Sequence, residues 1–469
     1  MPHTPSSPNP PGSTGPRPTE RSTERPGERQ TDRPVERQPD HPTVRQTAGA
    51  LAAALPRLAA AEGSGTQGRR AAPDRGRTLL GPALALVHTG QAPTRSVLTG
   101  ALEVTRATAG AVSAELEALG LITVDSSPAG GGRGRPSHRL SIDPSGPVVT
   151  AAQLHADGIS VALAGLGGQL EPPVHLPLPA ATDPVRLLRA VAEAGAALAR
   201  ASSRRCLGAA LALPNPVTEP DGTALAALHF SWPSGTPVAD LYAEEVRKAD
   251  HGPRALSPFP SAVANDANLA ALAEHRHGAG RGARHVLLVT SGHRGVGGAL
   301  VIDGRLHTGS AGLALEVGHL TVDPQGRRCL CGNQGCLNSE TDPEALFAAA
   351  GRTPDSARPL LAQARELAAD PSALPAVHHV VDRLGLGLAG LVNILNPDRI
   401  VLSGLHLDLL AAAPERLASV VAERCLWGRS GRVPIVPAEV THAGLVGAAE
   451  LAWAPYLHDP QSVLPVGGA

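Results

Sequence analysis

A histidine and three cysteines lie close enough in the sequence to form a metal site. Three of the chain's five cysteines fall within eight positions, and a histidine lies ten residues before the first of them. Zn²⁺ takes four such ligands in a tetrahedron at about 2.0–2.3 Å, and Gly332 and Gly335 allow the backbone to fold around one centre. Four protein ligands leave no open position, so the loop predicts a structural zinc ion, with reduced, unligated thiols as the alternative. The predicted ligands are His319, Cys329, Cys331 and Cys336.

The segments around these ligands resemble those of a known family. Residues 316–319 read EVGH and residues 329–336 read CLCGNQGC, which closely resembles the zinc signature of the ROK family. Members of that family are sugar kinases and sugar-responsive repressors built on one fold. The resemblance implies an α/β body with two lobes of the actin and hexokinase type. The family usually has a sugar-holding glutamate two residues after the last cysteine, and here that residue is Asn338.

The polar start of a predicted helix is the second feature with chemistry. Residues 265–278, NDANLAALAEHRHG, resemble the sugar-binding and catalytic segment of ROK proteins, with Asp266 in the place of the catalytic aspartate. The local alternative is a helix cap, because Asn or Asp before an Ala/Leu-rich run is a good helix start. The resemblance implies a sugar or sugar-phosphate site formed by Asn265, Asp266, Glu316 and His319, with His319 also bound to zinc.

Two segments that bind phosphate in ROK kinases are altered in this chain. Residues 153–160 read QLHADGIS where the kinases have DxGGT, and residues 292–299 read GHRGVGGA where they have GTGIGGG. Without the glycine pair and the threonine, the first segment fits an ordinary hairpin turn better than a phosphate loop. His293 and Arg294 add bulk to the second segment. We therefore expect a kinase-like domain that transfers no phosphate, in which Asp266 accepts a sugar hydroxyl.

The chain before this body predicts three short helices and a two-stranded hairpin. That order is the layout of a winged helix-turn-helix DNA-binding domain. The resemblance implies the same, because ROK repressors place such a domain directly before the body and have a wing similar to the GRGRP segment of this chain. A plain packing unit followed by a glycine-rich linker is the alternative. The expected elements are helices at Leu79–His88, Thr94–Val104 and Arg106–Leu119, a strand at Leu121–Val124 and a returning strand before Asp143.

In such a domain the third helix enters the major groove by its amino end. We expect Thr105, Arg106 and Thr108 to make base or near-base contacts there. The start of the second helix offers hydroxyls and amides to a phosphate, and arginines in the wing suit a phosphate or the minor groove. These further DNA contacts are Thr94, Arg95, Ser96, Arg133 and Arg135.

Composition limits where a DNA-binding surface could lie. The formal net charge is −1, so any attraction to DNA must be local, and it must come from arginine because Lys248 is the only lysine. Between Arg69 and Arg139 the arginines outnumber the acids. Cys206 and Cys425 stand alone and indicate buried thiols in a reducing compartment. No apolar run is long enough for a membrane span, and we expect a cytoplasmic protein.

The sequence divides into three predicted regions. Residues 1–76 are rich in Pro, Arg, Ser and Thr and predict a disordered leader. Residues 77–146 are the predicted winged helix-turn-helix domain, and residues 147–469 are the effector-binding and oligomerisation body, with its zinc loop at 319–336.

Together these features predict a transcriptional regulator, most simply a repressor, that binds double-stranded DNA and a sugar or sugar phosphate. A homodimer or homotetramer is expected, since one short recognition helix reads few base pairs. The alternatives are an active ATP-dependent sugar kinase and a regulator without a sugar effector, the latter favoured by Asn338.

Overall fold

The computed structural model describes residues 77–463, except for 126–136, 156–157, 179–182, 226–231, 293–294 and 427–432. The chain divides into two compact parts, residues 1–70 and residues 71–469, and all described residues belong to the second part. The predicted leader therefore lies outside the described residues. So do the wing arginines Arg133 and Arg135, the pair His293 and Arg294, and Asp157 in the first hairpin turn.

The first lobe of the body is built on a five-stranded sheet. A hairpin of β3 and β4 starts it, and β6 and β7 continue it in parallel with β3. All eight residues of β6 are buried, as expected for a parallel strand that is covered on both faces. In sheet order the strands are β5 (Val174–Pro177), β4 (Gly158–Ala164), β3 (Val148–Leu154), β6 (Cys206–Leu213) and β7 (Ser261–Asn265).

The second lobe repeats this arrangement. Its hairpin of β8 and β9 is antiparallel, and β11 and β12 are added in parallel to β8. In sheet order the strands are β10 (Arg305–Leu306), β9 (Val296–Ile302), β8 (His285–Ser291), β11 (Arg399–Gly404) and β12 (Ile435–Pro437).

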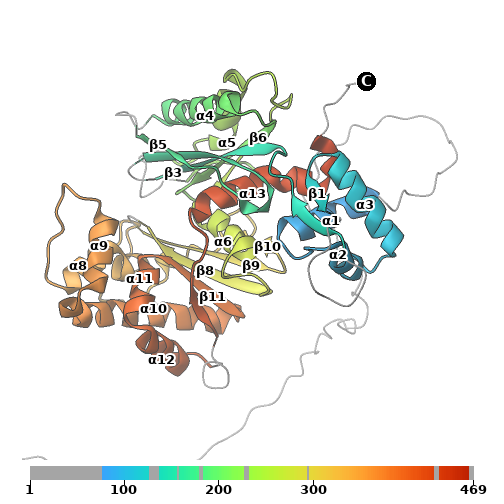
Figure 1. Cartoon of the computed structure of the whole chain (residues 1–469). Helices are drawn as coiled ribbons and strands as arrows, with labels where there is room; N and C mark the ends of the chain where they lie inside the picture. Colours follow the sequence, from blue (N-terminus) through green and yellow to red (C-terminus); the bar gives the residue numbers. More distant parts are fainter. Residues whose placement is uncertain are drawn as a thin grey trace, which may run out of the picture. The chain divides into compact units, whose positions relative to one another are not determined.

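Two helices, α6 (Asp266–His277) and α13 (Ala443–His458), lie between the two sheets and pack against each other (Figure 1). Residues of α13 share a core with β3 and β6, and residues of α6 share a core with β8, β9 and β11. Helices α4 (Pro184–Ala201) and α5 (Val238–Lys248) cover the other face of the first sheet. The predicted two-lobed α/β body is therefore confirmed.

The outer face of the second sheet is covered by the remaining helices of the body, and α10 is the longest of them. It begins at Leu374 and has a proline in its first turn, where the backbone N–H that proline lacks would have no partner within the helix. The helices of this face are α7 (Leu337–Thr341), α8 (Pro343–Ala349), α9 (Leu360–Ala369), α10 (Leu374–Leu395), α11 (Leu405–Ala412) and α12 (Pro414–Arg424).

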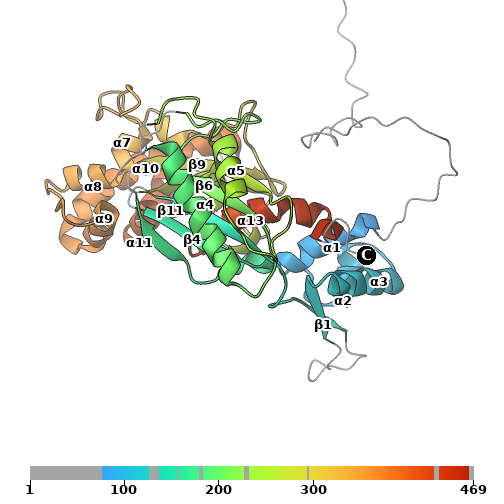
Figure 2. The same ribbon diagram turned by 90° about the horizontal axis from the view of Figure 1, so that it is seen from above.

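Before the body, the chain forms three helices and a two-stranded antiparallel sheet, at the places the sequence predicted. Figure 2 shows this amino-terminal unit beside α13. Leu84 of α1, Leu116 of α3 and Trp453 of α13 belong to one buried cluster, so the unit shares its hydrophobic core with the body. The elements are α1 (Arg77–His88), α2 (Arg95–Ala101), α3 (Arg106–Ala118), β1 (Ile122–Asp125) and β2 (Arg139–Ile142).

No helix among the described residues has both the length and the apolar character needed to cross a membrane.

Candidate metal centre and effector site

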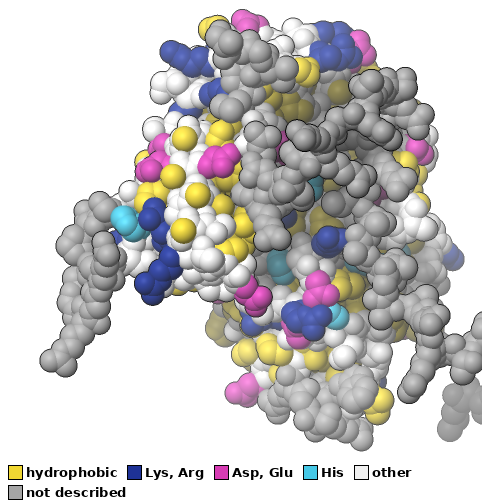
Figure 3. All heavy atoms as spheres, turned by 90° about the vertical axis from the view of Figure 1, so that its right-hand side faces the viewer, with side chains coloured by type: hydrophobic (Ala, Val, Ile, Leu, Met, Phe, Trp, Pro, Cys, Tyr) yellow, Lys and Arg dark blue, Asp and Glu magenta, His cyan; other side chains and the backbone are white. Residues whose placement is uncertain are grey.

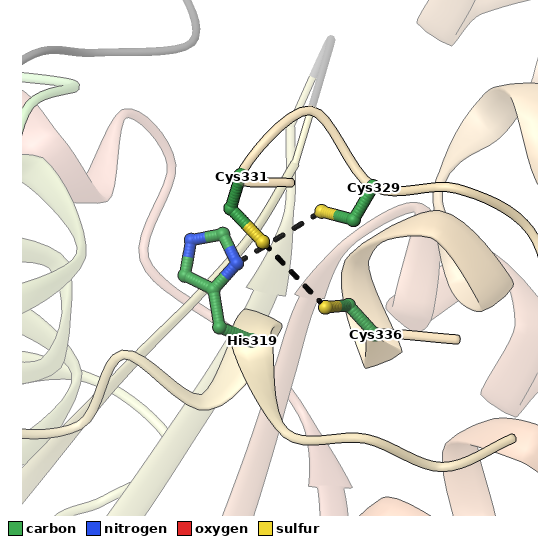
Figure 4. Close-up of side chains that lie close together, drawn as sticks. All are labelled: His319, Cys329, Cys331 and Cys336. Atoms are coloured by element: carbon green, nitrogen blue, oxygen red, sulfur yellow. Dashed lines mark hydrogen bonds between the residues drawn. The ribbon is translucent and has the colours of Figure 1, made fainter. Parts of the chain in front are cut away.

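The four predicted metal ligands come together in one cluster (Figure 4). The sulfurs of Cys331 and Cys336 are 3.7 Å apart, and the Cys329 sulfur lies 3.9 Å from Nδ1 of His319. A tetrahedral zinc with sulfur ligands at about 2.3 Å would place two sulfurs about 3.8 Å apart. All four ligand atoms lie within 4.8 Å of one another, so the cluster is compact enough for one tetrahedral ion to contact all four.

Two glycines shape the loop that carries the cysteines. Gly332 and Gly335 have φ angles of 94° and 67°, a region that favours glycine. A Cβ atom on Gly335 would overlap the carbonyl oxygen of Asp323, so no other residue fits there. The Gly335 carbonyl accepts from the amide of Val322 at 2.8 Å, which ties the cysteine loop to the segment after His319.

The electrostatics of the cluster favour a bound cation. Burial, together with the Cys331 and Cys329 sulfurs beside it, raises the pKa of the Cys336 thiol to about 12. Burial also lowers the pKa of His319, which keeps its imidazole neutral, as a metal ligand must be. Several sulfurs in so small a space would repel one another as thiolates, and a divalent cation removes that repulsion.

The first residues of β9 bring two parts of the predicted effector site together. A Cβ atom on Gly297 would lie 3.0 Å from Cβ of Ala267, at the start of α6. A Cβ atom on Gly298 would lie 2.5 Å from the Val317 side chain, in the turn that carries His319. The absence of side chains on these glycines lets the helix start and the histidine turn approach the same strand.

The two carboxylates at this junction are perturbed by their surroundings. Burial raises the pKa of Asp266 to about 7, and the nearby charge of Glu316 adds to the effect. Burial also raises the pKa of Glu316. A half-buried carboxyl group whose pKa is near 7 is typical of a site that binds a ligand or moves a proton.

Asn265 is held by the helix that it begins. Its Oδ1 accepts from the amides of Ala267 and Asn268 at 3.0 and 3.1 Å, and its Nδ2 donates to the carbonyl of Asn215 at 3.1 Å. The helix-cap interpretation therefore applies to Asn265. The cap also fixes the direction of the first turn, and with it the place of Asp266.

Asn338 has a role that the sequence did not reveal. It is only 6% exposed, its Oδ1 accepts from the amide of Val296 at 2.6 Å, and its Nδ2 lies 3.9 Å from the Cys329 sulfur as a donor. This side chain therefore connects the first residue of β9 to the metal cluster. The sequence signal was only a departure from the family pattern, which gave no partner for the amide.

The residues that flank the hairpin turn, which would hold phosphate in a kinase, make contacts of their own. The Gln153 side chain packs directly on Gly444 at the start of α13, where a Cβ atom, if Gly444 had one, would lie 2.5 Å from it. Ser160 bonds to two imidazoles, with Oγ 3.1 Å from Nε2 of His155 and 2.8 Å from Nδ1 of His175. These contacts fit the interpretation of an ordinary hairpin turn.

Threonines cap the second and third helices of the amino-terminal unit. Oγ1 of Thr94 accepts from the amide of Val97 at 3.3 Å, and Oγ1 of Thr105 accepts from the amide of Thr108 at 3.1 Å. The hydroxyls of Thr105 and Thr108 are also 2.9 Å apart, so these two residues bond to each other at the start of α3.

The two described arginines among the predicted DNA contacts differ in exposure. Arg106 is exposed at the start of α3. Arg95 is half-buried beside Gly110 of α3, and its Nε finds no hydrogen-bond partner within the described ranges. Ser96 is exposed, and its amide donates to Oγ of Ser137 at 3.0 Å, which ties the start of α2 to the segment before β2.

The described part of the amino-terminal unit is less basic than the sequence indicated. Figure 3 shows basic side chains gathered beside apolar surface on the face that looks out from the right of Figure 1. Two glutamates of α3 accept hydrogen bonds within the protein. Glu117 accepts from the amide of Val124 at 2.9 Å, and Glu115 accepts from the side chain of Gln461 at 2.7 Å. The excess of arginine depends mainly on Arg133, Arg135 and residues before 77, outside the described ranges.

Known proteins with similar sequences include both kinases and regulators. A glucokinase of Halalkalibacterium halodurans is 34% identical over 214 residues, which are 42% of this chain and 61% of that protein. The regulator NagC of Escherichia coli, described as a DNA-binding transcriptional dual regulator, is 29% identical over 197 residues, which are 40% of this chain and 48% of NagC. The aligned segments thus span less than two thirds of either relative.

Solved structures show the same mixture. A ROK family transcriptional regulator described as a homologue of the E. coli MLC protein has a TM-score of 0.63 at 24% identity, covering 83% of this chain and 98% of its own. The ROK hexokinase of Thermus thermophilus has a TM-score of 0.52 at 28% identity, covering 67% of this chain and 99% of its own. Residues 151–454, which make up most of the two-lobed body, match the sequence pattern of the ROK family. This chain therefore belongs to the ROK family.

Proposed function

We propose that this protein is a transcriptional regulator that binds double-stranded DNA through its amino-terminal unit and a sugar or sugar phosphate through its body. The unit of α1–α3 with β1 and β2 acts as a winged helix-turn-helix domain, and the body is expected to form a homodimer or homotetramer so that two such units contact one operator. Repression is the simplest outcome of operator binding.

The observation that carries this proposal is the amino-terminal unit itself. Three helices and a hairpin precede the body, and α3 presents the exposed Arg106 at its amino end. The fold similarity supports it as well. The regulator structure covers 83% of this chain and the hexokinase 67%, a difference close to the length of this unit.

The effector site is proposed at the start of α6. Asp266 and Glu316 offer acceptors for sugar hydroxyls, and Nε2 of His319 remains available when its Nδ1 faces the sulfurs. Asn265 contributes by capping α6 and thereby positioning Asp266. Zinc, held by His319 and the three cysteines, is proposed as a structural ion that fixes the turn beside this site.

A sugar kinase is the second candidate, favoured by the sequence similarity to glucokinases. Transfer of phosphate requires backbone amides or metal-bound groups that cradle the nucleotide phosphates. The hairpin turn that should supply them lacks the glycine pair and the threonine of the kinases, and the side chains of Gln153 and Ser160 beside it contact Gly444 and two histidines instead. We therefore favour a body that binds a sugar without phosphorylating it.

Gel shifts would test the DNA-binding part of the proposal. The wild type is expected to bind DNA from the region upstream of its own coding sequence more tightly than scrambled DNA. Arg106→Ala should lose about 1–3 kcal/mol on the specific site and much less on scrambled DNA, because a base contact carries sequence information. The matched variant is the double change Arg133→Ala, Arg135→Ala. It should weaken binding to both DNAs alike and reduce the dependence of binding on salt concentration.

The outcomes separate the candidate functions. No DNA binding by the wild type under any salt condition would refute the regulator proposal. Equal losses on both DNAs for Arg106→Ala would refute the role of Arg106 alone. A thermal-shift series with monosaccharides distinguishes a sugar-responsive regulator, which should be stabilised by a sugar, from one without a sugar effector.

A further inference from the structure

One buried carboxylate joins three segments that are far apart in the sequence. Glu450 of α13 is 1% exposed, and its oxygens lie 2.9 and 3.0 Å from Nε2 of His88, the last residue of α1. Its Oε1 lies 2.7 Å from Nε2 of His277, the last residue of α6, and Arg276 donates to its Oε2. We name His88, His277, Arg276 and Glu450 the Glu450 cluster.

A backbone amide fixes the direction of the hydrogen bonds. The amide of Gly167 donates to Nδ1 of His88 at 2.8 Å, so that nitrogen must be the unprotonated one. The proton of the His88 ring is then on Nε2, and Nε2 donates to Glu450. A metal ion would need the lone pair of the same nitrogen. The cluster is therefore a hydrogen-bonded connection centred on a carboxylate rather than a second metal site.

Helix α6 runs from the proposed effector site to this cluster. Asp266 is its first residue and His277 its last, so the two ends are about 16 Å apart along a rigid rod. Its last turn is fixed to the segment before α13 as well, because buried Glu274 accepts from the amides of Glu439 and Val440 at distances of 2.8 to 3.2 Å. A displacement of the start of α6 at Asp266 would therefore also displace His277 at its other end, next to Glu450.

Helix α1 is fixed on the other side of the cluster. A Cβ atom on Gly81 would lie 2.7 Å from the carbonyl oxygen of His458, so α1 and α13 are in close backbone contact. The end of α1 continues into a hydrogen-bonded turn, in which the amides of Gln91 and Ala92 donate to Leu86. That turn leads directly into α2, whose start is one of the proposed DNA-contacting segments.

We propose that the Glu450 cluster is the link through which occupancy of the effector site at the start of α6 changes the position of the DNA-contacting helices. This inference rests on the proposed function for its consequence, although the physical connection between α1 and α6 does not. A coupling of this kind can be carried by a contiguous chain of packed helices and hydrogen bonds between the two sites. Here the path is α6, the Glu450 carboxylate, His88 and α1.

The connection itself is tested by hydrogen exchange on the full-length protein, without DNA or sugar. Glu450→Gln keeps the shape of the side chain but replaces one of its two acceptor oxygens by an NH₂ donor, which in either orientation of the amide faces two N–H donors of the cluster. We expect exchange to become about tenfold faster or more in two places at once, residues 86–92 and residues 274–280. Gln461→Ala is the control, because the Gln461 side chain donates to Glu115 of α3 and, among the described residues, has no hydrogen bond to the cluster.

A milder variant guards against loss of folding. His277 is partly exposed, with 12% of its side chain accessible, so His277→Gln should fold and show the same paired effect at smaller size. Faster exchange in only one of the two regions would overturn the proposal, as would equal changes in Gln461→Ala. The exchange result is independent of whether the protein binds DNA.

The regulatory consequence is tested with D-glucose and N-acetyl-D-glucosamine in gel shifts. For any sugar that changes the DNA affinity of the wild type, Glu450→Gln should reduce that change to within about twofold of none, while the sugar-induced thermal shift remains. A variant that keeps the full sugar effect would overturn the proposal. If the wild type binds neither DNA nor sugar, the proposed function fails, and the exchange experiment alone still decides whether the cluster connects α1 and α6.

Discussion

Removal of the Asp266 carboxylate should stabilise the protein, and more so at high pH. Burial, with Glu316 nearby, raises the pKa of Asp266 from 3.8 to about 7. A raised pKa means that the folded protein holds this proton more tightly than the unfolded chain does. The stability is therefore fully present below about pH 4 and is lost as the pH rises through about 7. Asp266→Asn cannot ionise, so it escapes that loss.

The magnitude follows from the linkage relation. Each pKa unit corresponds to about 1.4 kcal/mol. With a pKa near 4 in the unfolded chain and near 7 in the folded one, the carboxyl group lowers the free energy of unfolding by roughly 1.4 kcal/mol at pH 5 and roughly 4 kcal/mol at pH 8. Because Asp266 is half-buried and partly solvated, these are upper values. We expect the advantage of Asp266→Asn to grow by about 1–2.5 kcal/mol between the two pH values.

Urea unfolding of wild type and variant at pH 5 and pH 8 would measure this difference. Any effect of pH on the metal cluster is common to both proteins and cancels. Asp370→Asn is the control with the opposite sign, since hydrogen bonds from Ser372 and then Arg352 lower the pKa of Asp370 to about 2. Its stabilising effect is present above about pH 4, so the loss in this variant should be the same at pH 5 and pH 8.

A variant advantage that does not change between pH 5 and pH 8 would refute the reasoning. It would mean that Asp266 is already ionised at pH 5 in the folded protein, and that burial does not raise its pKa. The proposed effector site would then begin with an ordinary solvated carboxylate.

Three further predictions concern the metal cluster and the kinase alternative. The protein should contain about one zinc per chain by elemental analysis, and Cys331→Ser should lose it and weaken DNA binding; absence of metal in protein prepared without chelator contradicts this. Asn338→Asp replaces the donor to Cys329 by a charge and should release zinc to a chelator about 10–100-fold faster, and an unchanged rate would exclude that contact. A coupled assay with ATP should show no hexose phosphorylation above background, and turnover that disappears in Asp266→Asn would favour the kinase.

The sequence alone was enough for the features that depend on short spacing. His319 and the three cysteines are close in the chain, and Gly332 and Gly335 have the positive φ angles that their positions implied. The caps at Thr94 and Thr105 were also readable, because a cap involves residues two or three positions apart. Family membership followed from the same local segments, since a metal loop constrains its residues strongly.

Longer-range contacts were decided only by the tertiary structure. Arg95 sits at the expected helix start, yet its side chain lies partly buried beside Gly110, because the packing of α2 on α3 sets its direction. Asn338 stood out in the sequence, but its bond to Val296 depends on how α7 meets β9. In both cases the position in the chain was readable while the partner was not.

The Glu450 cluster is the clearest case of this kind. His88 and Glu450 are 362 positions apart, and neither stands in a segment whose spacing indicates chemistry. A buried carboxylate is stable only where the fold brings it donors, so its partners are selected by the packing of α1 and α6 against α13. Spacing along the chain therefore determined the metal loop and the helix caps, whereas the connection between the amino-terminal unit and the body exists only in three dimensions.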